Sequence, residues 1–168
     1  MNTKDSIAVA SRSFSKNDFL LARLKERYSL ITLNNSGKTL TGEELVKFLM
    51  PARKAIIGIE EISASLLAQL PKLSVISKYG VGLNNLDLTS MKAKGIKLGF
   101  TPGVNKQSVA ELALTLTLTA LKKIHGNNID ILNGYWSQEK GSELYGKTIG
   151  LLGFGNIGKR LATLIQPF

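Results

Sequence analysis

Short apolar runs alternate with amphipathic helical patterns along the first hundred residues, and this alternation restricts the chain to an α/β fold. Helix N-termini are predicted at two polar residues, Ser15 and Thr41. The alternation predicts a parallel five-stranded sheet with helices on both faces. The expected strands are residues 7–10, 30–33, 54–59, 73–77 and 96–100.

Residues 109–121 permit two interpretations. Leucine alternates there with alanine and threonine, which is the period of a half-buried strand. We nevertheless predict a helix, because the capping-box pair Ser108 and Glu111 opens the run and Gly126 closes it after a cationic last turn. A helix this apolar needs burial on most sides, which a second subunit could provide.

The carboxyl-terminal part contains a glycine fingerprint. Residues 127–147 are predicted to be a loose connection, 148–152 a sixth strand, and the segment ending at Ile165 a helix. In the run from Gly153 to Gly158, the first glycine would permit a tight turn, the second would let backbone amides approach a pyrophosphate, and the third would allow close packing. An ordinary strand-to-helix turn is the alternative interpretation.

Two further turns follow predicted strands. Residues 78–87 lie past the carboxyl end of the fourth strand, the edge where open parallel sheets bind ligands. Glycine amides there can hold a carboxylate, although a purely structural turn remains the alternative. Residues 101–105 form a rigid Pro-Gly turn that suits a domain hinge, a ligand contact, or both.

Several kinds of site are excluded or not predicted. The chain has no cysteine, which excludes disulfides, thiolate metal sites and a cysteine nucleophile. His125 lies at a predicted helix end, where a capping or solvent-exposed role is expected. Two carboxylate pairs, Glu43-Glu44 and Glu60-Glu61, are interpreted as helix-start residues that favour the dipole. We therefore predict no catalytic residue and no metal site.

The net charge is +10, from 22 Lys+Arg against 12 Asp+Glu. This charge keeps a nucleic-acid binder as an alternative, but the scatter of the basic residues argues against it. A positive field can also attract anionic metabolites. Residues 7–10 are too short for the core of a secretory leader and 109–121 too short for a membrane span, so we expect a cytoplasmic protein without membrane contact.

Three segments together resemble the D-isomer-specific 2-hydroxyacid dehydrogenase family, most closely its phosphoglycerate dehydrogenase branch. They are residues 76–82 with 85–87, residues 101–105 with 108–111, and residues 146–158. The resemblance implies a flavodoxin-like substrate-binding domain, whose first part is residues 1–102, and the incomplete beginning of a Rossmann NAD-binding domain at 103–168. It also implies a homodimer formed through the helix at 108–123.

The same resemblance implies roles for individual residues. Asn105 would touch the substrate across the hinge, and Asn84 stands where the family usually has aspartate, which removes a charge from the loop. The residues that would line the substrate-carboxylate and nicotinamide side of the cleft are Lys78, Gly80, Val81 and Gly82. Those that would carry the NAD pyrophosphate are Gly153, Phe154, Gly155, Asn156, Ile157 and Gly158.

The family implies oxidation of the CH–OH group of a small anionic D-2-hydroxy acid, such as 3-phosphoglycerate, with hydride transfer to NAD. The fingerprint's acidic ribose-binding residue, expected about 20 positions downstream, lies beyond Phe168. So do the family's substrate-binding arginine and its Glu/His pair. We therefore expect this chain to be a truncated and inactive piece of such an oxidoreductase. The alternative is a non-catalytic binding or dimerisation protein built on the same scaffold.

Overall fold

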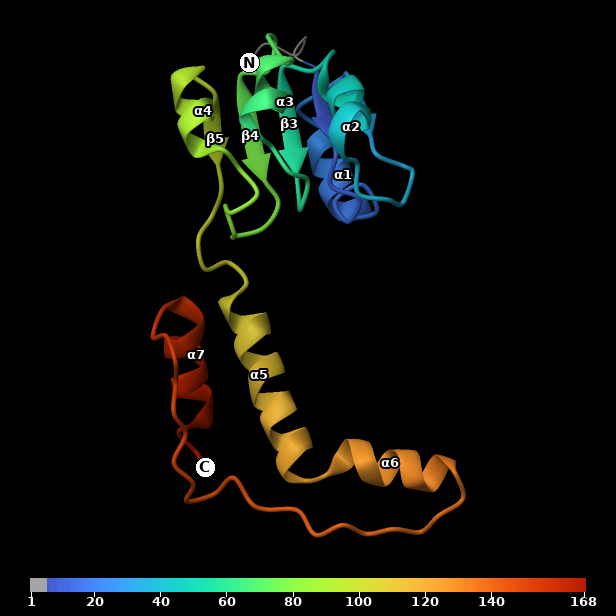
Figure 1. The fold of residues 1–168 in the computed structure, drawn as a ribbon, viewed down its shortest axis with the longest axis vertical. Coiled ribbons are helices and arrows are strands. Elements are labelled where there is room, and N and C mark those ends of the chain that lie inside the picture. The colour runs from blue at the N-terminus through green and yellow to red at the C-terminus, as the bar shows by residue number, and fades with distance from the viewer. Residues whose placement is uncertain (1–5) are drawn as a thin grey trace. The chain divides into compact units, whose positions relative to one another are not determined.

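The computed structural model describes residues 6–168. The chain divides into two compact units, Met1–Pro102 and Gly103–Phe168. The first unit is an α/β sandwich and the second consists of helices joined by extended chain (Figure 1). Each unit is described by itself. Across the described residues, no helix combines the length and the apolar character that a membrane crossing requires.

The first unit contains the predicted five-stranded sheet, and every strand pair in it is parallel. The spatial order is β2-β1-β3-β4-β5, which is the flavodoxin-like order. The direction of winding reverses between β1 and β3, and ligands bind outside the carboxyl ends of strands at such a point. The strands are β1 Ile7–Val9, β2 Ile31–Leu33, β3 Lys54–Ile57, β4 Val75–Lys78 and β5 Lys97–Gly99.

Helices cover both faces of this sheet (Figure 1). Alternate residues of β1 and β3 point to opposite sides, so Val9 and Ile56 pack with α1 while Ala8 and Ile57 pack with the other helices. Both clusters are apolar, as expected for strands that are covered twice. The helices are α1 Asp18–Lys25, α2 Gly42–Leu49, α3 Ala64–Ala68 and α4 Leu88–Ala93.

The predicted helix starts are partly wrong. The N-cap of α1 is Asn17, whose side chain accepts from Leu20 N at 3.0 Å, whereas Ser15 donates its hydroxyl to Val9 O. Thr41 is the N-cap of α2, but its side chain makes no capping hydrogen bond. Asx and Ser/Thr side chains have several local backbone partners, so spacing alone does not select among them.

The second unit begins with α5, Lys106–Leu121, which confirms a helix where the residue pattern was ambiguous. Its N-cap is Asn105, so Ser108 lies inside the first turn and the predicted capping box is wrong. Leu112 and Leu116 are 57% and 58% exposed, so this helix is not buried within its own unit.

A helix follows where a loose connection was predicted. Lys123 has a left-handed backbone with φ 56°, which ends α5, and α6 (Ile124–Leu132) starts at the next residue. Gly126 and the asparagines after it resemble a helix stop, yet they lie inside α6. His125 is exposed in its first turn, as expected.

The predicted sixth strand is absent from the described residues. Residues 148–152 form no ladder, and Leu152 is fully exposed at 103%. A strand needs a neighbour to satisfy its backbone groups, and no described strand lies beside this segment. The helix after it is confirmed as α7, Asn156–Ile165. It lies beside α5 (Figure 1), where Gln107 accepts from Arg160 and donates to Glu111.

Candidate functional site

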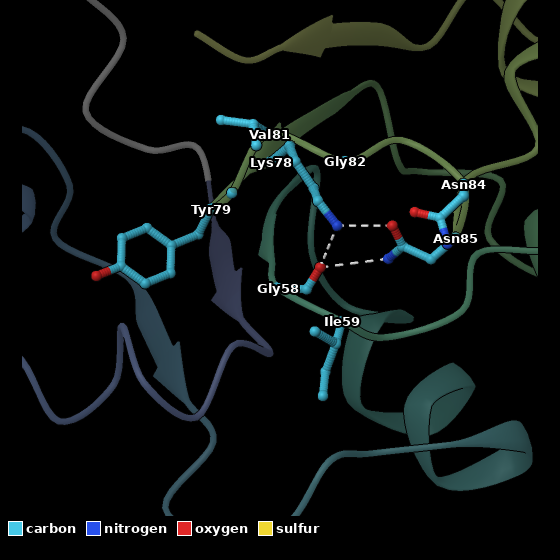
Figure 2. A pocket seen from close by; sticks show the side chains of 9 residues that line it. Gly58, Ile59, Lys78, Tyr79, Val81, Gly82, Asn84 and Asn85 are labelled. Carbon is cyan, nitrogen blue, oxygen red and sulfur yellow. Dashed lines mark hydrogen bonds between the residues drawn. The ribbon is translucent and has the colours of Figure 1, made fainter. Parts of the chain in front are cut away.

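A pocket of about 290 Å³ opens at the carboxyl edge of the sheet, where β3 and β4 end (Figure 2). It contains four of the five predicted substrate-binding residues. The fifth, Asn105, lies in the other unit. The lining residues are Gly58, Ile59, Lys78, Tyr79, Gly80, Val81, Gly82, Asn84 and Asn85.

Lys78 is the cation of this pocket, and its ammonium is held in place. Its Nζ donates to the carbonyl oxygen of Gly58 and, at 2.6 Å, to Oδ1 of Asn85. Asn85 Nδ2 donates in turn to the same Gly58 oxygen at 3.2 Å, so the three groups form a closed triangle (Figure 2). A charge fixed in this way requires little reordering when an anion arrives.

Burial lowers the pKa of Lys78 below its ordinary value of 10.5, and the negative charge of Glu60 opposes this effect. The site therefore places a partly desolvated ammonium beside a glycine-rich turn, an arrangement that suits a carboxylate or phosphate ligand.

The glycine turn leaves the pocket open on one side. Gly80 has φ +143°, a conformation that an L side chain rarely adopts, and a Cβ there would meet only the Lys78 side chain at 3.5 Å. The Tyr79 ring is directed away from the ammonium (Figure 2). It packs edge-on against Phe14, with ring centroids 5.2 Å apart. Ile59, 66% exposed, gives the mouth an apolar wall.

Glu60 was predicted to be a helix-start residue, and this is wrong. It precedes α3 in the β3–α3 loop, is 1% exposed, and accepts from Gly58 N through Oε2 at 2.6 Å. Asn85 donates to the Glu60 carbonyl at 2.6 Å. Its pairing with Glu61 suggested a role at a helix start. The position of Glu60 just past a buried strand could instead have placed it at the carboxyl edge of the sheet.

The pocket lies beside the point where the sheet's winding reverses. Gly58 follows β3, and a Cβ there would meet Ser11 Oγ, just past β1, at 3.0 Å. The loops after β1 and β3 therefore approach one another closely before they diverge to opposite faces. Topology and the lysine triangle thus indicate the same edge as the ligand-binding edge.

The fingerprint turn in the second unit has the backbone that its glycines predict. Gly153 has φ +94°, and a Cβ on Gly158 would come within 2.5 Å of the Gly153 carbonyl oxygen. Gly155 is the N-cap of α7 and has open space around it. Phe154, Asn156 and Ile157 complete the turn and are exposed. The backbone amides at the N-terminus of a helix can donate hydrogen bonds to an anion.

The Pro-Gly turn at residues 101–105 approaches this fingerprint through Gly103, within the second unit. Gly103 has φ +71°, and a Cβ there would lie 2.8 Å from the side-chain nitrogen Nδ2 of Asn156. Asn105 occupies the N-cap position of α5 without a capping hydrogen bond from its side chain, and its Oδ1 is buried without a partner among the described residues. A buried acceptor without a partner is unusual in a folded protein, so Asn105 has hydrogen-bonding capacity that the described residues do not use.

The chain is similar to known dehydrogenases over most of its length. It is 36% identical over 139 residues to hydroxypyruvate reductase of Thermotoga maritima, a match that covers 81% of this chain and 45% of that protein. It is 34% identical over 134 residues to human D-3-phosphoglycerate dehydrogenase, covering 78% of this chain and 25% of that enzyme. The chain thus spans less than half the length of either relative.

A solved structure gives the same result. The structure from Polaromonas sp. JS6 66, described as a D-isomer specific 2-hydroxyacid dehydrogenase, NAD-binding, superposes with a TM-score of 0.86 at 25% identity. The superposition covers 97% of this chain and 52% of the Polaromonas chain. The family model for the catalytic domain of D-isomer specific 2-hydroxyacid dehydrogenases matches residues 8–144. This chain therefore belongs to the D-isomer-specific 2-hydroxyacid dehydrogenase family.

Proposed function

We propose that this chain forms part of an NAD-dependent oxidoreductase that acts on the CH–OH group of a D-2-hydroxy acid. The observation that carries the proposal is the Lys78 ammonium, held by Gly58 and Asn85 beside an open glycine turn at the carboxyl edge of the sheet. Such a cation provides the charge that a 2-hydroxy or 2-oxo acid needs for its carboxylate.

The first unit would bind the substrate and the second would begin the cofactor domain. Residues 1–102 bind the substrate, with Lys78 facing its carboxylate and the amides of Gly80, Val81 and Gly82 beside it. Asn105 adds a substrate contact through its unpartnered oxygen. Residues 103–168 begin the cofactor domain. We propose no residue for proton transfer.

The residues of the fingerprint turn fit a dinucleotide. Gly155 leaves open space where a side chain would obstruct a pyrophosphate, and the first amides of α7 provide donors. The residues from Gly153 to Gly158 would hold that group. NAD, when bound, supplies the acceptor for the hydride released from the hydroxy acid. Relatives include proteins named for phosphoglycerate and for hydroxypyruvate, and we propose a small substrate of this chemical class.

We also propose that the chain forms a homodimer through the helix at 108–123. Leu112 and Leu116 are one helical turn apart and both are more than half exposed on α5. Exposed apolar side chains arranged in this way are typical of a surface that a partner covers.

Amide chemical shifts of the ¹⁵N-labelled 168-residue chain test the two binding roles separately. Pyruvate should perturb Gly80, Val81 and Gly82, and NAD should perturb the residues from Gly153 to Gly158. Lys78→Met should abolish the first response only, and Gly155→Val the second only. If pyruvate and NAD leave both turns unperturbed at millimolar concentration, the proposed function is wrong.

A further inference from the structure

Glu60 is a buried carboxylate with an incomplete set of partners. Its side chain is 1% exposed; Oε2 accepts from Gly58 N, and Oε1 accepts no hydrogen bond from any described residue. Burying an ionised carboxylate with an unsatisfied oxygen is costly, so such groups are usually retained beside a cation. Glu60 is therefore expected to have a cation nearby.

Lys78 is that cation. The Glu60 carboxylate fixes Gly58 through its N–H, and the Gly58 carbonyl accepts from the Lys78 ammonium. Asn85 forms a second link, because it donates to the Glu60 carbonyl and accepts from Lys78. Glu60 is also the charge that raises the pKa of Lys78 against the effect of burial.

The other charged or titratable groups described on β4 and the neighbouring segments either have other partners or lie at the other end of β4. Asp87 accepts from Ser90 N as the N-cap of α4, and Tyr79 packs against Phe14. On the neighbouring strands, Lys54 lies over the Tyr28 ring, and Lys97 pairs in register with Val75, at the opposite end of β4 from Lys78. Glu60 is thus the carboxylate placed to act on the Lys78 ammonium.

We propose that Glu60 is the positioning residue of the Lys78 anion site: it holds the Gly58 carbonyl against the ammonium and places a buried carboxylate behind it. Burial disfavours the charged form of a lysine, so without a nearby carboxylate the ammonium would lose its proton, and with it its attraction for an anion, at a lower pH. This role for the ligand rests on the proposed function, whereas the coupling between Glu60 and Lys78 does not.

The test is the titration of Lys78 in the 168-residue chain, followed by competitive labelling with acetic anhydride and peptide mass spectrometry. Glu60→Gln retains an oxygen to accept from Gly58 N but removes the charge. The half-labelling pH of Lys78 should fall by about one pH unit, the size expected for loss of a nearby opposite charge. The matched control is Glu61→Gln, which removes an adjacent, exposed carboxylate and should leave Lys78 unchanged.

A folded Glu60→Gln variant in which Lys78 titrates as in the unsubstituted chain would overturn the proposal. If Glu60→Gln does not fold, stability decides in its place. Lys78→Met leaves the Glu60 charge without its cation, so Lys78→Met with Glu60→Gln should unfold at a denaturant concentration no lower than Lys78→Met alone. If the two substitutions lower the free energy of unfolding additively, the proposal is also overturned.

The pyruvate experiment separates this inference from the proposed function. A shift in Lys78 titration without any response to pyruvate would retain the Glu60–Lys78 coupling and reject the substrate role. If pyruvate binds and Glu60→Gln changes neither the Lys78 titration nor the pyruvate affinity, the substrate role is retained and the Glu60–Lys78 coupling is rejected. If both hold, Glu60→Gln should weaken pyruvate binding several-fold at alkaline pH, where the variant's lysine is neutral.

Discussion

Gly158 packs so closely against Gly153 that a Cβ at position 158 would come within 2.5 Å of the Gly153 carbonyl oxygen. The contact involves backbone rather than a flexible side chain, so it cannot be relieved without moving the turn. The third glycine of the fingerprint is therefore required by packing inside this chain, independently of any ligand.

Gly158→Ala should destabilise the second unit. Alanine normally favours a helix over glycine by about 1 kcal/mol, but forcing a Cβ into filled space costs roughly 1–3 kcal/mol, so we expect net loss. Hydrogen exchange of the α7 amides would measure it. Gly155→Ala is the control, because position 155 has open space and an ordinary φ of −82°. Equal protection of α7 in the two variants would contradict the prediction.

Asn85→Ala should destabilise the first unit by about 1–3 kcal/mol, the range for leaving buried polar groups unpaired. The change removes the amide that joins Lys78, Gly58 and the Glu60 carbonyl. Urea unfolding of the 168-residue chain would measure this loss. Asn84→Ala provides the comparison, since Asn84 lines the same pocket but is exposed. Similar losses in the two variants would show that the triangle contributes little.

The sheet could be predicted from sequence because its strands are local apolar runs whose partners lie in the same unit. Val9 and Ile57 are buried on opposite faces, so both faces of the sheet are apolar and the signal in the sequence is strong. Residues 148–152 carry the same kind of signal, but no described strand lies beside them. A strand is a property of a pair, and an apolar run describes only one member.

The site could be predicted only in part. Lys78 and its glycines are contiguous in sequence, and their position after a strand identifies the edge where they lie. Gly58 lines the same pocket from the loop after β3, and Glu60 lies behind it in that loop; both come to β4 through a strand register that no local pattern specifies. The buried state of Glu60 depends on that long-range pairing, which is why the sequence predicted only a helix-start role for it.

Lys78 should make stability depend on pH. Its pKa is lowered by burial in the folded state and stays near 10.5 in the unfolded chain. In the alkaline window between these values the unfolded state binds the proton and the folded state does not, so stability rises with pH there. Unfolding curves of the unsubstituted chain and Lys78→Met, compared from neutral pH to 10.5, isolate this contribution. A difference between them that stays flat or falls across the window would contradict the lowered pKa.

Leu112→Asp should convert the proposed dimer into a monomer. Leu112 and Leu116 expose adjacent apolar surface on α5, and a carboxylate there would be desolvated on association without a described partner. Light scattering coupled to gel filtration would give the mass over a range of concentrations. Leu30→Asp is the matched control, because Leu30 is equally exposed at 58% but lies in the first unit. Because both leucines already face solvent in the single chain, the change should not unfold α5. A dimer that survives Leu112→Asp, or that Leu30→Asp disrupts equally, would place the interface elsewhere.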